Sequence, residues 1–267
     1  MKIGYIADVV GSPGRDMISL HVKKLKAEFG LDLVIANTEN ASAGFGITAK
    51  NAVELFESGI DVMTGGNHTW DRKEIVECFK TMNILRPLNL PKETAGSGTL
   101  VLDVNNQKLA IINLMGYFAM PMCNNPFTTI KEEVEKLKGE VKSIFIDFHA
   151  EATSEKRALL ALLKGEVSAI VGSHTHVGTD DLVVDNGTFY VSDVGLTGCR
   201  DNVIGMDEKA PLKRFLTGMS ASFEVPKKCR KILQMVILDI EGFTCKEAFK
   251  IKIYDDKERI ITQAIYE

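Results

Sequence analysis

The chain has 267 residues, of which 45% are hydrophobic and 25% are charged. These proportions are typical of a globular protein with a sizeable core, which excludes a disordered chain and favours one large domain over residues 1–267. The formal net charge of -4 gives no general attraction for a long polyanion. We therefore expect no tracking along extended nucleic acid, and any phosphate must be attracted locally.

The cysteines and the first residues indicate the compartment. The five cysteines have no CxxC spacing and resemble neither a disulfide framework nor a thiolate zinc site, which favours a reducing cytoplasm. The apolar run that starts at Ile3 stops at Asp8, too short for the core of a signal peptide, and no run approaches membrane-spanning length. We expect a cytoplasmic protein without a membrane segment, with self-association into a homo-oligomer as the default at this size.

Short β-rich runs alternate with helical patterns through most of the chain. In chain order, the predicted strands are Ile3–Ala7, Leu31–Ala36, Ile60–Thr64, Leu109–Leu114, Ile144–Phe148 and Ala169–Val171. Apolar residues at three- and four-residue spacings predict the helices between them. These helices are Met17–Phe29, Ala49–Glu57, Lys73–Met82, Ile130–Lys138 and Glu155–Leu163, with Gly30, Gly59, Gly139 and Gly165 at the expected C-cap positions. The alternation predicts a largely parallel sheet, because parallel neighbours need a crossover.

The last third of the chain has a different pattern. Thr188–Val191, Gln234–Ile240 and Ala248–Tyr254 are predicted strands, and a turn at Gly242 joins the last two, so antiparallel pairs are expected here. The segment Gly195–Pro226 has little periodicity and predicts a long loop, either a lid or an ordinary excursion. Together these patterns predict an α/β fold with a mixed two-sheet core flanked by helices.

Polar residues that can bind a metal follow the predicted strands. They are Asp8, Glu39, Asn40, Asn67, His68, His149, His174 and His176. Because residues beyond the carboxyl ends of parallel strands converge on one edge of a sheet, we expect these side chains to meet there. Each also has an ordinary explanation on its own, since Asp and Asn suit turns and a lone histidine is often part of a core.

The pair His174 and His176 is the most informative part of this set. Residues two apart at the end of a strand point to the same side, so both imidazoles are expected to face one cluster. Imidazole, carboxylate and amide ligands together suit borderline divalent or ferric ions, and the absence of cysteine argues against a structural thiolate zinc site. The set as a whole therefore predicts a metal site.

The order of these motifs resembles the calcineurin-like metallophosphoesterases, and most closely their YmdB branch. The motifs that carry the resemblance are Asp8, Glu39-Asn40, Gly66-Asn67-His68, His149 and Gly172-Ser173-His174-Thr175-His176, together with Gly11-Ser12-Pro13-Gly14-Arg15 and Asn37-Thr38-Glu39-Asn40-Ala41. The resemblance covers nearly the whole chain and implies α/β/β/α layers. Val10 stands where the broad superfamily has a histidine, and Glu39 stands in place of the bridging aspartate; both departures are those of the YmdB branch.

The resemblance implies a dinuclear, metal-dependent phosphodiesterase. Two metal ions, iron first with manganese or zinc as alternatives, would be held by Asp8, Asn40 and His176 on one side and by Asn67, His149 and His174 on the other, with Glu39 between them. Such a pair can generate a hydroxide nucleophile and clamp the oxygens of a phosphoryl displacement. His68 would protonate the leaving oxygen, although it could instead only orient a carboxylate. The implied substrates are 2′,3′-cyclic nucleotides or short RNA-like diesters.

Other functions and other residues stay open at this point. A dinuclear amidohydrolase is disfavoured, because its paired histidines lie near the first strand. A phosphomonoesterase remains an alternative, as does a metal-dependent regulatory or scaffold protein that binds nucleotides and hydrolyses them slowly. The weaker candidates are Arg15 for the first loop or a phosphate, Glu151 and Thr153 for orienting His149 or capping a helix, and Phe45 and Arg200 for a nucleobase or a phosphate.

Overall fold

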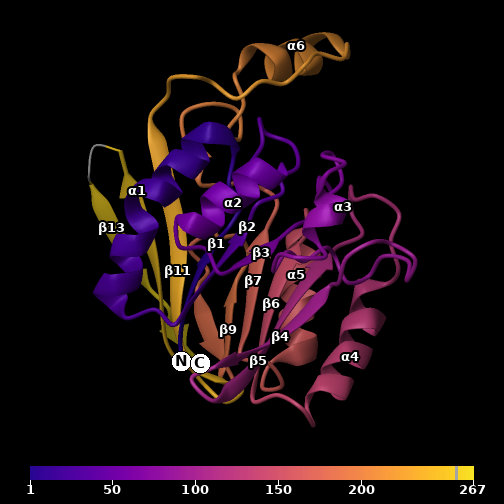
Figure 1. Cartoon of the computed structure of the whole chain (residues 1–267), viewed down its shortest axis with the longest axis vertical. Coiled ribbons are helices and arrows are strands. Elements are labelled where there is room, and N and C mark those ends of the chain that lie inside the picture. Colours follow the sequence, from indigo (N-terminus) through magenta and orange to yellow (C-terminus); the bar gives the residue numbers. More distant parts are fainter. Residues whose placement is uncertain (256–257) are drawn as a thin grey trace.

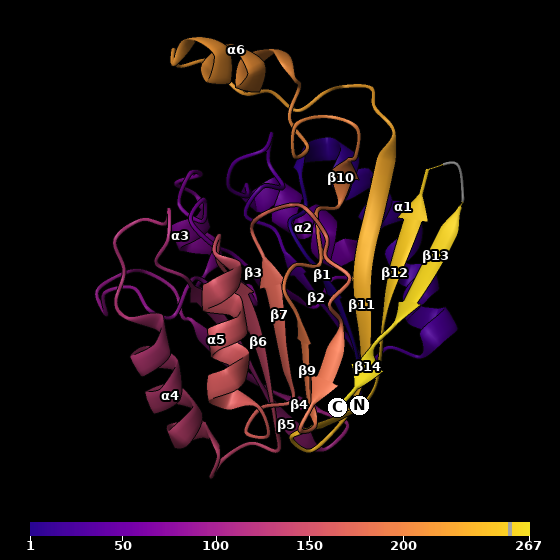
Figure 2. The same ribbon diagram turned by 180° about the vertical axis from the view of Figure 1, so that it is seen from behind.

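Two β-sheets lie face to face between two layers of helices in the computed structural model, which describes residues 1–255 and 258–267 (Figures 1 and 2). The first sheet has the strand order β13-β12-β11-β1-β2-β3, with β10 also paired to β11. Its strands are β1 (Lys2–Ile6), β2 (Leu33–Asn37), β3 (Val62–Thr64), β10 (Gly198–Cys199), β11 (Lys231–Glu241), β12 (Thr244–Tyr254) and β13 (Arg259–Gln263). Strands β1, β2 and β3 are parallel, whereas β11 is antiparallel to both β1 and β12.

The second sheet has the order β14-β8-β9-β7-β6-β5-β4. Its strands are β4 (Thr99–Val104), β5 (Gln107–Met115), β6 (Ser143–His149), β7 (Ala169–Ser173), β8 (Val183–Asp185), β9 (Thr188–Val191) and β14 (Ile265–Tyr266). Strands β5, β6, β7 and β9 are parallel. The predicted combination of parallel crossovers with antiparallel pairs in the last third is confirmed.

The alternation of side chains along each strand builds the layers. On β1, Ile3 and Tyr5 pack between the sheets, where the Tyr5 ring lies 5.4 Å from that of Phe145 on β6. The next residue, Ile6, faces the helical layer on the other side. The helices are α1 (Gly11–Phe29), α2 (Ala49–Glu57), α3 (Ile75–Cys78), α4 (Pro126–Leu137), α5 (Thr153–Leu163) and α6 (Lys209–Thr217). Helices α1 and α2 cover the first sheet and α4 and α5 the second, so the expected two-sheet α/β fold is confirmed.

Several boundaries differ from the prediction. The helix expected over Lys73–Met82 is only the four-residue α3, and α1 begins at Gly11, six residues earlier than expected. Gly30 caps α1 with φ 63, as predicted. The segment Gly195–Pro226 is not wholly a loop, because it contains β10 and α6. Helix α6 projects from the end of the molecule opposite the two termini (Figure 1).

A disulfide links Cys199 to Cys229 across 30 positions of sequence. The expectation that the cysteines do not pair is wrong for these two residues. Sequence spacing could not reveal the pair, because β10 and β11 are brought side by side only by the sheet. The bond closes the base of the excursion that carries α6. Across residues 1–255 and 258–267, no helix combines the length and apolar character that crossing a bilayer requires.

Candidate metal centre

The carboxyl ends of five parallel strands bring the predicted residues to one edge of the molecule. Asp8 follows β1, Glu39 and Asn40 follow β2, and Asn67 and His68 follow β3. From the second sheet, His149 is the last residue of β6 and His174 comes directly after β7. The two sheets meet here, since the His174 backbone N–H donates to Asp8 Oδ2 at 3.0 Å. The predicted convergence at strand ends is therefore what the fold produces.

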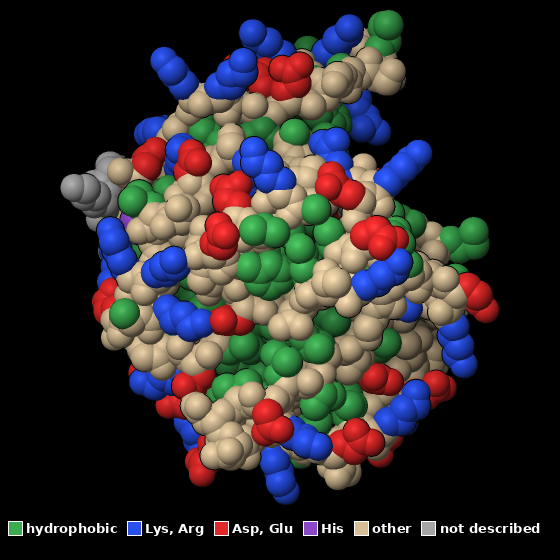
Figure 3. Space-filling model, in the orientation of Figure 1, with side chains coloured by type: hydrophobic (Ala, Val, Ile, Leu, Met, Phe, Trp, Pro, Cys, Tyr) green, Lys and Arg blue, Asp and Glu red, His purple; other side chains and the backbone are tan. Residues whose placement is uncertain are grey.

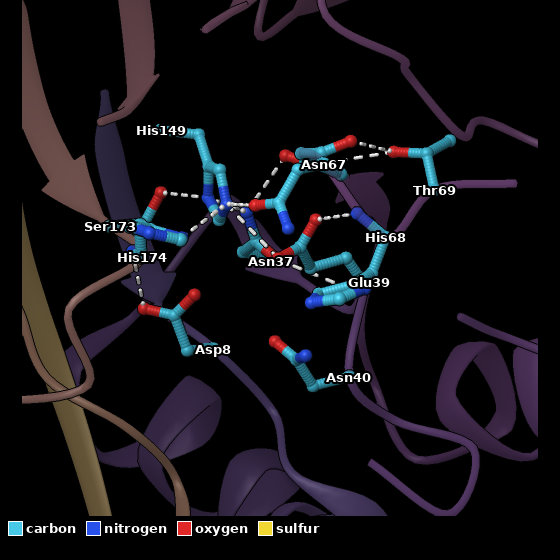
Figure 4. Close-up of polar contacts among 12 residues, drawn as sticks. Asp8, Asn37, Glu39, Asn40, Asn67, His68, Thr69, His149, Ser173 and His174 are labelled. Carbon is cyan, nitrogen blue, oxygen red and sulfur yellow. Dashed lines mark hydrogen bonds and ion pairs between the residues drawn. The ribbon is translucent and has the colours of Figure 1, made fainter. Parts of the chain in front are cut away.

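The imidazole of His149 is the centre of a first group of ligand atoms (Figure 4). Its Nε2 lies 3.0 Å from Glu39 Oε1, 3.0 Å from Asn67 Oδ1 and 3.1 Å from His174 Nδ1. Ligands bound about 2.0–2.2 Å from one ion are themselves separated by roughly 3.0–3.5 Å. The spacing of these four side chains therefore fits a shared cation.

A second group contains oxygen atoms that lack partners. Asp8 Oδ1 and Asn40 Oδ1 are buried and accept no hydrogen bond, and the nearest ring nitrogen to Asp8 Oδ1 is His176 Nε2 at 4.0 Å. The Asp8 carboxylate and Asn40 amide point toward the same space as Glu39 (Figure 4). Leaving a buried acceptor unsatisfied costs about 1–3 kcal/mol. A cation between Asp8, Asn40 and His176 would remove that cost, so these residues fit a second metal.

The electrostatics of the group favour positive charge beside the buried carboxylates. Burial raises the pKa of Asp8 to about 6. Burial opposes ionisation of Glu39 as well, but the neighbouring His149 lowers the pKa of this carboxyl to about 2, and the same pairing raises the pKa of His149 to about 9 against its own burial. Burial and His149 together lower the pKa of His174 to about 3, which keeps it neutral. His149 thus takes the place of a cation beside Glu39.

Each of the three histidines has its other ring nitrogen held. The Nδ1 of His149 lies 3.0 Å from Ser173 Oγ, and that hydroxyl donates to Asp147 Oδ1 at 2.7 Å. His174 Nε2 lies 3.1 Å from Glu151 Oε2, and His176 Nδ1 lies 2.7 Å from the Ile204 carbonyl oxygen. Metal-ligating histidines usually donate their second N–H to such an acceptor, which fixes the tautomer.

Three of these orienting groups were missed in the sequence. Asp147 lies inside a run that predicts only a buried strand, although its spacing of two from His149 places both on one face of β6. Ser173, on the neighbouring strand, was named only as part of the motif that contains His174 and was given no role, and Ile204, in the excursion, had no local signal. Glu151 was expected to orient His149, but it contacts His174 instead.

The expectation that His174 and His176 follow the alternation of one strand is wrong. Strand β7 ends at Ser173, and the two histidines have φ values of 100 and 65. The alternation of a strand therefore does not apply to them. A buried ion pair holds this segment instead, because Lys156 Nζ contacts the Ser173 carbonyl and Asp193 Oδ2, each at 3.0 Å, and Asp193 accepts the Thr175 N–H.

His68 lies at the rim of the group. Its backbone N–H donates to Glu39 Oε2 at 2.8 Å, and its ring Nδ1 lies 2.8 Å from Asp71 Oδ2. The ring packs edge-on against Phe45 at 5.0 Å. Because Asp71 occupies Nδ1, the opposite ring nitrogen remains for a substrate. The imidazole does not pair with any proposed ligand, so its role as proton donor stays a prediction.

A cavity of about 600 Å³ opens over these residues. His68, His174 and His176 line it, together with Phe45 and residues of the excursion such as Ile204.

Of the weaker candidates, Arg15 braces the loop after β2 through the Ala41 carbonyl and Glu54. Arg200 stacks on Tyr254 at 4.4 Å, and Thr153 begins α5.

Glycine is required where β3 approaches the centre. A Cβ on Gly66 would lie 2.3 Å from His149 Nε2 and 2.5 Å from Glu39 Oε2. No side chain fits at these distances, so the Gly66-Asn67-His68 motif lets the backbone pass directly behind the ligands.

An α/β/β/α sandwich with this set of side chains at the carboxyl ends of its strands is the arrangement of a calcineurin-like metallophosphoesterase. The family model for YmdB-like proteins matches residues 5–253, and the chain belongs to that family. The resemblance seen in the sequence is thereby confirmed.

Relatives and solved structures agree with this membership. The chain is 44% identical to the "2′,3′-cyclic-nucleotide 2′-phosphodiesterase" of Bacillus subtilis (strain 168), over 94% of this chain and 96% of that protein. A hypothetical protein of Thermus thermophilus superposes with a TM-score of 0.90 at 34% identity, covering 95% of this chain and 99% of that one. A structure described as a novel phosphatase of Mycoplasma pneumoniae gives 0.89 at 33%, covering 99% and 94%.

Proposed function

We propose that the protein is a dinuclear metal-dependent phosphodiesterase that hydrolyses 2′,3′-cyclic nucleotides or short RNA-like diesters. The name of the Bacillus subtilis relative supports this substrate class. The observation that carries the proposal is the pair of ligand groups that flank Glu39: one around His149 Nε2 at 3.0–3.1 Å, the other with two buried oxygens that have no partner.

The chain's own residues have separable tasks in this proposal. Asn67, His149 and His174 would hold one cation and Asp8, Asn40 and His176 the other, with Glu39 available to both. When bound, such a pair activates water and stabilises the charge of a phosphoryl group under attack. His68, with its Nδ1 held by Asp71, donates a proton from its opposite nitrogen to the leaving oxygen.

Charge balance supports an anionic substrate. Two divalent ions set against the Asp8 and Glu39 carboxylates and one hydroxide leave a net charge of roughly +1 at the centre. This local charge would attract a phosphoester to a protein whose net charge is -4. On the face drawn in Figure 3, acidic and basic side chains are intermixed over the body of the molecule, while Lys and Arg predominate on the segment that projects at the top.

For the metal we propose iron first, with manganese or zinc as alternatives. The donor set of imidazole nitrogens with carboxylate and amide oxygens suits borderline ions, and no cysteine belongs to it. The cytoplasmic location expected from the sequence stays a prediction. That expectation was based on unpaired cysteines, and the Cys199–Cys229 disulfide weakens this basis. Self-association also stays a prediction.

Elemental analysis of the purified protein, combined with a screen of cyclic, linear and monoester phosphates, tests the proposal. We expect two metal ions per chain and a preference for the cyclic diester. The Glu39→Gln variant should lose multiple turnover while it stays folded by circular dichroism. One metal ion or none under metal-replete conditions, or full activity in Glu39→Gln, would show that the proposal is wrong.

A further inference from the structure

The turn at residues 203–206 has an unexpected residue at its tip. Val203 and Met206 exchange backbone hydrogen bonds of 3.1 and 2.9 Å, so the turn has two central residues, Ile204 and Gly205. Their φ values are 46 and 91. Turns with two positive φ values favour Asn and Gly, because a Cβ crowds the backbone there and a β-branched side chain is the least tolerated.

The chain itself contains two turns for comparison. The β4–β5 hairpin has Asn105 and Asn106 in its turn, with φ 52 and 63. The β8–β9 hairpin has Asn186 and Gly187, with φ 48 and 83. Both follow the usual preference. The backbone preference of this kind of turn therefore does not account for isoleucine at position 204. We look for the explanation in the contacts of its side chain.

The backbone of Ile204 has a role that any residue could perform. Its carbonyl oxygen lies 2.7 Å from His176 Nδ1 and so orients that imidazole. A carbonyl is supplied by every amino acid, and asparagine or glycine would supply it without strain. Orientation of His176 thus explains the turn but not the isoleucine.

The side chain of Ile204 lies in the wall of the cavity above the ligands. The residue is 48% exposed, and it lines the cavity together with Phe45, Phe223 and the histidines. Phe45 adjoins His68, so the apolar part of the cavity begins next to the proposed proton donor. An apolar wall beside a charged centre fits a ligand with a planar apolar part and an anionic part.

We propose that Ile204 is a specificity-determining residue that contacts the nucleobase of the substrate while the phosphate lies at the clustered ligands. The inference rests on the proposed function and adds to it the surface that recognises the base. The strained backbone of Ile204 is then tolerated because its apolar side chain favours substrates that carry a base.

The test compares two esters that differ only in the base, a 2′,3′-cyclic nucleotide and ribose 2,3-cyclic phosphate. In Ile204→Asn we expect the ratio of kcat/KM for the nucleotide to that for the base-free ester to fall about tenfold, as loss of one apolar contact commonly does. Relief of strain should raise Tm by about 2–4 °C. Metal content should equal that of the parent, because the carbonyl is retained. Ile204→Gly should reproduce the change in ratio.

The matched control is Asn186→Ile, which places the same side chain in the same kind of turn away from the cavity. It should lower Tm and leave the ratio of the two esters as in the parent. An unchanged ratio in both Ile204 variants would overturn the inference while leaving the proposed function intact. A metal-loaded parent that hydrolyses neither ester would reject the proposed function, and the inference with it.

Discussion

Replacement of His68 by alanine separates proton donation from metal binding. The hydrogen bond between His68 and a proposed ligand runs through its backbone N–H, which donates to Glu39 Oε2 at 2.8 Å. Alanine retains that N–H. The variant should therefore keep the metal content of the parent and lose only what the imidazole contributes.

The size of the loss follows from the exposure of the ring. A positioned acid or base contributes about 10²–10⁴ in rate. The His68 side chain is 30% exposed, so water can partly replace it, and we expect kcat to fall by about 10², or about 2.7 kcal/mol of transition-state stabilisation. Asp71→Asn keeps the imidazole but weakens its anchor, and because Asp71 is 44% exposed the expected loss is only about threefold to tenfold.

Steady-state kinetics on a cyclic diester and metal analysis of the same preparations measure both quantities. Imidazole added to His68→Ala should restore part of the rate, since the cavity beside Phe45 would be open to it. Parallel loss of metal and activity would instead make His68 a ligand. Rates within twofold of the parent would remove it from the chemistry altogether.

Three further measurements test the metal ligands, their protonation and the disulfide. His174→Ala should bind fewer metal ions than the parent by elemental analysis, and an unchanged stoichiometry of two would contradict its assignment. In metal-free protein, His149 has a pKa of about 9 and Asp8 of about 6, so both bind protons that a metal must displace. Affinity measured by calorimetry should therefore rise about tenfold per pH unit between pH 6 and 9, and more steeply below pH 6, whereas a flat profile would refute this electrostatic account. Cys199→Ser combined with Cys229→Ser should lower the free energy of unfolding in urea by up to about 3–4 kcal/mol, the loop-closure value for a separation of 30 residues, and a parent indifferent to reductant would contradict it.

The sequence predicted those parts of the site that depend on strand ends. Glu39, Asn67 and His149 each follow a run of buried apolar residues, and parallel pairing necessarily brings such positions together. The boundaries of α2 were also predicted from the spacing of its apolar residues, and Thr48 caps the helix by accepting the Asn51 backbone N–H. The pattern within a single strand or helix was sufficient for these features.

Elements with little apolar contrast, and contacts between distant segments, could not be predicted. Strand β4 was missed because its side chains are mostly half-buried or exposed, with little apolar contrast to detect. Helix α6 was missed because it projects from the body, where its Phe215 and Leu216 are more than 80% exposed and only Pro211 is buried. The acceptor for each histidine comes from another strand or loop, which no local spacing encodes.

The backbone at the proposed ligands explains why so much of the surrounding chain is committed to them. Asp8, His174 and His176 have φ values of 41, 100 and 65, in the region that favours glycine. Each such residue costs on the order of 1–3 kcal/mol, and the conformation persists only where neighbours determine it. Around His174 and His176 this is done by the buried Lys156–Asp193 pair, with both side chains at most 2% exposed. Flexible loops that an ion orders would not require such a buried ion pair. Contacts within the protein therefore hold the strained backbone at these histidines, and such a rigid framework favours preorganised charge at the proposed centre.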